Sequence, residues 1–316
     1  MEEVQEVEVR VDDAASVPQQ SGPGAPTHPH LTVVPVRHPG RWASGIVALI
    51  LLALLVRAFA QADIEYGLIP GYLIDPSILT GVRNTLILTV LSMVLGLTLG
   101  VIVAVMQQSL NPVLRWLAAT YTWLFRGTPL LVQLLIWFSL SIVFKNLAIP
   151  GLFSVSMVSL MTPFVASLLG LGVNEGAYIS EIVRGGIISV DKGQREAAAA
   201  IGMSPIKTMT RIVLPQALRV ITPPLGNEFI ALLKFSSLAY TISYGELLQS
   251  ANKIYTANFK VIELLFTASI WYIVLTMIFT IGQQFLERRL SRGTGVARPS
   301  LWGHLRRNFS LRRNSK

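Results

Sequence analysis

Long stretches without any charged residue are the feature that most constrains this chain. A helix that crosses a bilayer needs roughly 20 apolar residues, within a range of about 17–25. Lipid offers no hydrogen-bond partners to open backbone groups, so such segments have to be helical. The uncharged stretches of this length are 84–106, 127–144, 153–172 and 264–286.

Two further apolar stretches carry charges or prolines. Trp42–Ala60 is broken only by Arg57, whose long side chain can reach the headgroup region. The stretch at about 216–245 contains Pro223, Pro224, Glu228 and Lys234. Only 14% of the residues are charged, against about 25% in soluble domains. The sequence therefore predicts an all-α integral membrane protein with about six transmembrane helices, rather than a large soluble protein with buried helices.

The two ends of the chain differ in charge. Residues 1–40 are rich in proline, glycine and glutamine and begin with acidic residues. This segment is too long and too acidic for the start of a signal peptide, and we interpret it as a disordered tail. Residues 287–316 hold nine basic residues and one acidic residue, Glu287, so this tail carries most of the net charge of +9. We expect it to contact anionic lipid, which makes nucleic-acid binding an unnecessary explanation for the charge.

Lysine and arginine near the helix ends predict the orientation of the chain. If the N-terminus is cytoplasmic, most of these bases face the cytoplasm, and both termini and the loop 184–215 lie on that side. The inner bases are then Arg37, Arg41, Arg115, Arg126, Arg184, Lys192, Arg195, Lys207, Arg211, Arg219, Arg288, Arg289 and Arg292, and the outer ones are Arg57, Arg83, Lys145, Lys253 and Lys260.

The loop 184–215 contains signals for two short helices. Asp191 is a favourable N-cap residue, with Gln194 at the spacing of a capping box. Gly202 suits the residue after a helix, where a left-handed backbone costs glycine little. Ser204 and Pro205 then predict a second helix start. A helix, a bend and another helix are therefore expected at the membrane face.

The same loop resembles a known family signature. Glu196-Ala197-Ala198 is followed after three residues by Gly202, and after nine more by Ile212-Val213-Leu214-Pro215. This pattern resembles the EAA motif of permeases of ATP-binding-cassette (ABC) importers, whose corresponding segment is a coupling helix that docks on the ATPase. The resemblance assigns ATPase coupling to Glu196, Ala197, Ala198, Gly202, Leu214 and Pro215. The alternative is an alanine-rich amphipathic helix on the membrane surface.

Further segments resemble the polar amino-acid permeases within that family. They are Arg126–Gln133, Gly176–Gly185, Gly193-Gln194, Leu214–Arg219, Asn227, Leu232–Lys234 and Ser237-Leu238. The similarity covers about 78–286. It implies a type I importer-like core of five helices in 78–286, to which 41–62 adds an extra N-terminal helix.

The resemblance also implies the partners and cofactors. Gly-Lys never occurs as a dipeptide, so the chain has no P-loop for nucleotide. We expect no cofactor, metal site or catalytic residue in this chain, with ATP and Mg²⁺ bound by separate ATPase subunits. The other expected partners are a second permease copy or paralogue, an extracytoplasmic solute-binding protein and membrane lipid. The expected function is ATP-driven import of polar or charged amino acids across the cytoplasmic membrane by alternating access.

Polar residues inside the apolar segments are candidates for the substrate path, because such groups are costly in a membrane. The candidates are Gln133, Glu175, Tyr178, Asn227 and Lys234. Bonds between helices would explain each of them equally well. Gly96-x-x-x-Gly100 and Gly172-x-x-x-Gly176 predict close helix packing. An ATP-independent ion channel or ion-coupled carrier remains the alternative function, whereas no paired carboxylates or nucleophile motif favour a membrane enzyme.

Overall fold

The computed structural model describes residues 9–10, 32–33, 39–149 and 153–290 of the 316 residues. The predicted tail 1–40 lies almost wholly outside these ranges, and so does the tail 287–316 beyond residue 290. The chain divides into two compact units, Met1–Ile64 and Glu65–Lys316.

Among its described residues, the first unit contains one helix, and this helix has no polar face. Strand β1 (Val9–Arg10) pairs antiparallel with β2 (Thr32–Val33), and helix α1 (Pro39–Gln61) follows. Within α1, the side chains of 43–61 are all exposed. A helix with no polar face and no buried face is suited to a lipid environment on all sides.

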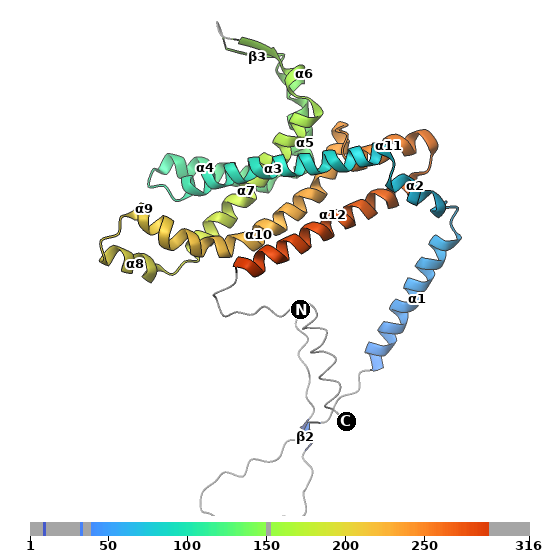
Figure 1. Ribbon diagram of the computed structural model, residues 1–316, viewed down its shortest axis with the longest axis horizontal. Helices are drawn as coiled ribbons and strands as arrows, with labels where there is room; N and C mark the ends of the chain where they lie inside the picture. Colours follow the sequence, from blue (N-terminus) through green and yellow to red (C-terminus); the bar gives the residue numbers. More distant parts are fainter. Residues whose placement is uncertain (1–8, 11–31, 34–38, 150–152, 291–316) are drawn as a thin grey trace, which may run out of the picture. The chain divides into compact units, whose positions relative to one another are not determined.

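The second unit is a bundle of helices with one short β-hairpin (Figure 1). Its elements in chain order are η1 (Tyr66–Leu68), α2 (Ile69–Leu73), α3 (Pro76–Gln107), α4 (Pro112–Gly127), α5 (Leu130–Val143), β3 (Asn146–Ile149), β4 (Phe153–Ser156), α6 (Met157–Leu160), α7 (Pro163–Ile188), α8 (Lys192–Ala200), α9 (Pro205–Thr208), the π-turn η2 (Met209–Val213), α10 (Leu214–Phe235), the 3₁₀ helix η3 (Ser236–Ile242), α11 (Leu247–Asn258) and α12 (Val261–Leu290).

Six helical segments account for the predicted spans. Among the described residues, three helices are long and apolar enough to cross a membrane: Ala43–Gln61, Pro76–Gln107 and Val261–Arg289. The pair α4 and α5, bent by 107°, forms a fourth segment if it is counted as one span. Helices α7 and α10 are more polar, but with 26 and 22 residues they are also long enough to cross. The prediction of an all-α membrane protein is confirmed.

Helices α3 and α7 pack backbone against backbone at the two glycine motifs. A Cβ atom added at Gly100 would lie 2.5 Å from Ile179 Cγ2, and one at Gly172 would lie 2.7 Å from Leu95 Cδ2. Gly96 faces the side chain of Glu175 in the same way. The predicted role of these glycines in packing is confirmed, and the two motifs pack against each other.

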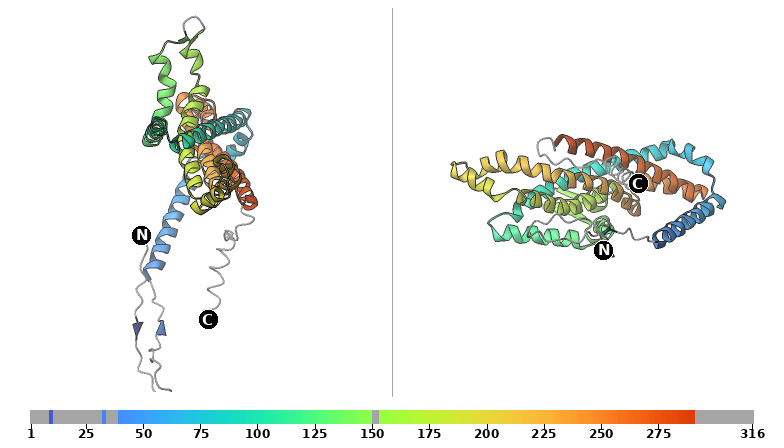
Figure 2. Two further views of the ribbon diagram at one scale, coloured as in Figure 1. Left: turned by 90° about the vertical axis from the view of Figure 1, so that its left-hand side faces the viewer. Right: turned by 90° about the horizontal axis from the view of Figure 1, so that it is seen from below.

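Two predicted helix boundaries are wrong. The segment from Phe153 starts as strand β4, and α7 begins only at Pro163, where the Thr162 side chain accepts a hydrogen bond from Val165 N. The stretch 127–144 is not one helix from its start, because α4 ends at Gly127 and α5 begins at Leu130 after a sharp bend. The left view of Figure 2 shows α5 and the β3–β4 hairpin projecting from the bundle.

The two prolines in the stretch at about 216–245 do not interrupt its helix. Helix α10 runs without a break from Leu214 to Phe235 with both prolines inside it. Gln283 Nε2 on α12 donates a hydrogen bond to the Pro223 carbonyl at 3.1 Å. This bond ties α10 to α12 beside the two prolines, whose missing N–H groups leave the carbonyls of Arg219 and Val220 without helical donors.

Candidate functional site

The loop after α7 contains the two predicted short helices, although neither the capping box at Gln194 nor a side-chain cap at Ser204 forms. Asp191 caps α8, and its Oδ1 accepts a hydrogen bond from Gly193 N at 2.6 Å, one residue before the capping-box position. Gly202 follows α8 with φ +77°, the left-handed conformation expected of it. Ser204 precedes Pro205 at the start of α9. The two short helices thus lie together at one end of the second unit (Figure 1).

Helices α8 and α9 present an exposed, largely apolar surface, which we call the α8–α9 surface and define as Glu196, Ala197, Ile201, Gly202 and Ile206. Both isoleucines are 76% exposed, and no atom lies within 4 Å of a Cβ built on Gly202. Ala198 points the other way and is 1% exposed. Exposed apolar groups around a glycine suit the close approach of a partner protein.

Helix α9 continues into α10 without interruption. The connecting segment is the π-turn η2, which inserts one wider turn between the two helices. Val213 in this turn is buried, whereas Leu214 and Pro215 at the start of α10 are exposed. Single π-turns inside helices are frequent at functional sites. The last two residues assigned by the motif therefore lie where the α9 segment joins a long helix.

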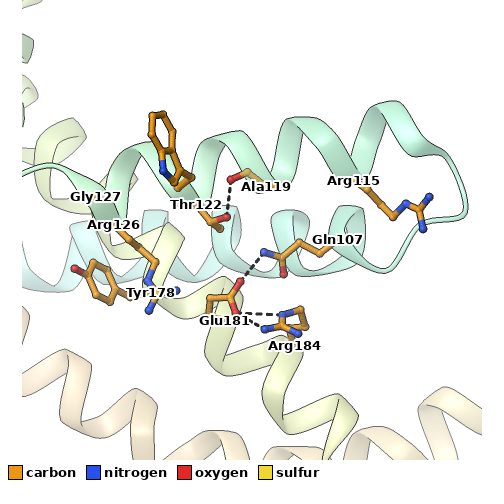
Figure 3. A pocket seen from close by; sticks show the side chains of 10 residues that line it. Gln107, Arg115, Ala119, Thr122, Arg126, Gly127, Tyr178, Glu181 and Arg184 are labelled. Carbon is orange, nitrogen blue, oxygen red and sulfur yellow. Dashed lines mark hydrogen bonds and ion pairs between the residues drawn. The ribbon is translucent and has the colours of Figure 1, made fainter.

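A cavity of about 690 Å³ lies between the end of α3, α4 and α7 (Figure 3). It has three arginines and one glutamate among its lining residues, so it offers both signs of charge with a positive excess. The lining residues are Gln107, Arg115, Ala119, Thr122, Trp123, Arg126, Gly127, Tyr178, Glu181 and Arg184.

Glu181 is the centre of a polar network in this cavity. It accepts hydrogen bonds from Gln107 Nε2 at 2.8 Å and from Arg184, at 3.1 Å from Nε and 2.5 Å from Nη2. The Arg126 guanidinium lies 5.3 Å from the centre of the Tyr178 ring, within the range of a cation–π contact. Arg184 is thereby committed to an ion pair, whereas Arg126 faces an aromatic ring at the cavity wall.

Gln133 does not line the cavity but holds the bend beside it. Its Nε2 lies 2.9 Å from the Phe125 carbonyl and 2.7 Å from Thr128 Oγ1. Asn174 Nδ2 on α7 also donates to the Phe125 carbonyl at 2.8 Å, and to Gln133 Oε1 at 3.1 Å. These buried amides satisfy the carbonyl groups that the bend leaves without a helical partner, and so fix the position of Arg126.

The other candidates for the substrate path are not gathered at one place. Tyr178 lines the cavity, and Glu175 lies one turn earlier on α7, 4% exposed, with no hydrogen-bond partner for Oε1 among the described residues. Asn227 and Lys234 are exposed on α10, and Asn227 Oδ1 accepts a hydrogen bond from Gln283 Nε2. The sequence did not single out Gln107, Thr122 or Trp123, because nothing local marks them as cavity residues.

Comparison with known proteins gives matches over most of the chain. Residues 96–292 match the family model described as binding-protein-dependent transport system inner membrane component. The arginine transport system permease protein ArgU of Corynebacterium glutamicum is 41% identical over 278 residues, covering 86% of this chain and 88% of that protein. The glutamine transport system permease protein GlnP of Escherichia coli is 33% identical over 216 residues, covering 68% of this chain and 93% of that protein.

Solved structures of ABC transporters also match most of this chain. The crystal structure of an amino acid ABC transporter with histidines matches with a TM-score of 0.63 and 33% identity, covering 72% of this chain and 100% of that one. The MetNI methionine ABC transporter in an inward-facing conformation matches with a TM-score of 0.57 at 19% identity, covering 68% of this chain and 96% of that one. The second match concerns the fold alone.

Proposed function

The chain belongs to the binding-protein-dependent transport system inner membrane components, and on this premise we propose that it translocates polar or charged amino acids across the cytoplasmic membrane. The observation that carries the proposal is the similarity to an arginine permease over 86% of the chain, with 41% identity. A contiguous stretch of that length has to include most of α1, so the similarity extends beyond the core that the family model matches.

The charges of the cavity suit an amino acid. A zwitterion carries a carboxylate and an ammonium group. The cavity offers the Arg126 guanidinium to the first, and Glu181, although paired with Arg184, adds negative charge near the second. We assign the substrate's carboxylate to Arg126, which faces the Tyr178 ring, and not to Arg184, which is paired with Glu181. Tyr178 and Glu175 belong to the path on α7, Asn227 and Lys234 contribute to it from α10, and Gln133 acts by holding the bend that carries Arg126.

The partners follow from the family and from the exposed surfaces. ATPase subunits, which bind ATP and Mg²⁺, dock on the α8–α9 surface, with Glu196, Ala197 and Gly202 at the contact. Ala198 packs inward below this contact, while Leu214 and Pro215 pass the movement into α10. A second permease copy or paralogue completes the path, and a solute-binding protein delivers the amino acid from outside. Both termini are cytoplasmic in this arrangement.

The transport cycle uses no covalent chemistry in this chain. ATP binding closes the partner ATPase dimer, the α8–α9 surface moves with it, and the cavity turns from inside to outside access. The loaded binding protein releases its amino acid into the path, and hydrolysis resets the assembly. Alternating access of this kind needs the α8–α9 surface and the cavity to be mechanically connected.

Uptake by the reconstituted transporter tests the proposal. The permease is placed in proteoliposomes with its ATPase and binding protein, and labelled arginine, glutamine, glutamate and cystine are supplied. We expect saturable uptake of at least one of them that requires both ATP and the binding protein. Uptake without ATP would instead support a carrier or channel, and an assembled complex that moves none of these amino acids would contradict the assignment.

A substitution in the cavity tests, in the same uptake assay, whether Arg126 binds the substrate's carboxylate. Arg126→Gln removes the guanidinium that faces the Tyr178 ring, and loss of one charge-assisted hydrogen bond of about 1.5–3 kcal/mol predicts a rise of the apparent KM by about tenfold or more. Lys253→Gln is the matched control, because Lys253 is an exposed base on α11 outside the cavity. Equal KM values for the two variants would remove Arg126 from the substrate site.

A further inference from the structure

Arg195 joins α8 to the end of α7. Its Nη2 donates a hydrogen bond to the Ile187 carbonyl at 2.6 Å. The last four carbonyls of a helix have no partner within the helix, and a cation there also interacts favourably with the helix dipole. Ser189 Oγ and Ser189 N supply donors to Gly186 O and Gly185 O. Ile187 O instead takes its donor from the next helix, so α8 caps α7.

The Arg195 side chain packs against the C-terminal end of α7. The residue is half-buried, and its Nε is buried without a hydrogen-bond partner among the described residues. Leaving a donor of a charged group without a partner costs free energy, so the guanidinium is held by its contacts and not by solvation. Lys192 and Lys207, the bases on either side, are exposed. Arg195 therefore differs from the solvated charges around it.

Helix α7 also carries lining residues of the cavity. Arg184 lies one turn before Ile187, and it is paired with Glu181, which accepts a hydrogen bond from Gln107 on α3. A continuous series of contacts thus leads from α8 through the end of α7 to the cavity. Helix α10, although continuous with α9, contributes no residue to the cavity lining. One route from the α8–α9 surface to the cavity therefore runs through α7.

We propose that Arg195 is a positioning residue that makes α7 follow α8, so that displacement of the α8–α9 surface by the ATPase is transmitted to the amino-acid cavity. The inference rests on the proposed function, because it assigns a role to a contact between the ATPase-facing helix and the substrate-facing helix. Breaking the bond leaves the docking surface intact but separates its movement from the cavity.

The first experiment measures amino acid taken up per ATP hydrolysed in proteoliposomes. Arg195→Met keeps the length and apolar body of the side chain but cannot donate, and we expect about a tenfold lower ratio with ATP hydrolysis maintained. Arg195→Lys retains one charged donor and should recover part of the loss. Lys192→Met, on the same helix but exposed, is the matched control and should keep the wild-type ratio. A wild-type ratio for Arg195→Met would overturn the proposal.

The second experiment does not depend on transport. The natural chain has no cysteine, so Gly185→Cys on α7 and Ala199→Cys on α8 give two unique sites for spin labels in the full-length protein. Both positions are exposed, and a Cβ at Gly185 meets no atom within 4 Å. We expect a narrow distribution of distances between the labels that broadens when Arg195→Met is added. An unchanged distribution would also overturn the proposal. If the wild type fails to transport amino acids but the distribution broadens, the proposed function fails and the α8–α7 connection stands.

Discussion

Two connections between helices in the second unit differ in how many buried contacts hold them. The turn 243–246 before α11, which we call the Glu246 turn, ends in a buried glutamate and is fixed by several bonds to other helices. Glu246 is fully buried and accepts hydrogen bonds from Leu248 N at 2.9 Å, Gln249 N at 2.7 Å and the Tyr272 hydroxyl at 2.7 Å. Asn84 Nδ2 on α3 donates to the Gly245 carbonyl at 2.8 Å.

The segment from Asp191 to Ser204 is exposed over most of its length. Ala198 is its buried apolar anchor, and the Arg195 bond connects it to the end of α7. Local stability in a protein follows the number of buried contacts, and the parts that move are drawn from the less stable regions. The Glu246 turn therefore holds α3, α11 and α12 together, whereas the α8–α9 segment is attached by few buried contacts, as the proposed docking of a partner requires.

The largest loss of stability is expected when the buried carboxylate of the Glu246 turn is removed. Glu246→Ala leaves two backbone donors and the Tyr272 hydroxyl without their acceptor in a buried site, a loss of roughly 3 kcal/mol or more. We expect a clear fall in the midpoint of thermal aggregation of the purified permease. Glu65→Ala is the control, because Glu65 is an exposed carboxylate whose pairing with Lys260 lies at the surface. Equal midpoints for the two variants would mean that the Glu246 turn is not a stability element.

A substitution at Gly202 is expected to change the thermal stability of the permease little but its association with the ATPase strongly. Gly202→Val forces a β-branched residue into φ +77°, at a cost of roughly 1–2 kcal/mol. It also places a bulky side chain on the α8–α9 surface. We expect co-purification of the ATPase to be lost while the thermal midpoint of the permease alone stays near that of wild type. Gly185→Val is the control, because Gly185 has no positive φ and lies outside this surface. It tests whether adding a valine side chain to any exposed glycine is enough to weaken ATPase association. Full ATPase association of Gly202→Val would contradict docking at this place.

The smallest effect is expected at the cap of α8. Asp191→Ala removes the bond to Gly193 N, and loss of an N-cap costs about 1 kcal/mol. Because α8 is exposed, we expect this cost to appear as faster amide hydrogen exchange within 192–200, with the rest of the molecule unchanged. Asp191→Asn preserves the cap and should restore protection. A fall in global stability equal to that of Glu246→Ala would remove the distinction between the two connections.

The sequence predicted local features well because short-range rules decide them. The N-cap role of Asp191 and the left-handed backbone of Gly202 depend on their neighbours in the sequence and not on the rest of the fold. The start of α7 was missed because apolarity alone cannot separate a strand such as Phe153–Ser156 from a helix, although Thr162-Pro163 carries the usual signal for a helix start.

The cavity and the Arg195 contact depend on long-range geometry. Gln107 and Glu181 are 74 residues apart in the sequence, and only the packing of α3 on α7 brings them together. Arg195 looks like any basic residue on an amphipathic helix until its carbonyl partner on α7 is known. The sequence motif therefore located the α8–α9 surface, whereas the connection from that surface to the cavity required the structure.

The packing of α3 on α7 has a consequence for sequence divergence. Gly96, Gly100, Gly172 and Gly176 each meet atoms of the opposite helix at distances that leave no room for a methyl group. A change to alanine at any one of them requires the opposing side chain or backbone to move, which weakens the packing of α3 on α7. Larger residues at these four positions should therefore be rare among natural variants of this chain, because each would loosen the contact between two walls of the cavity.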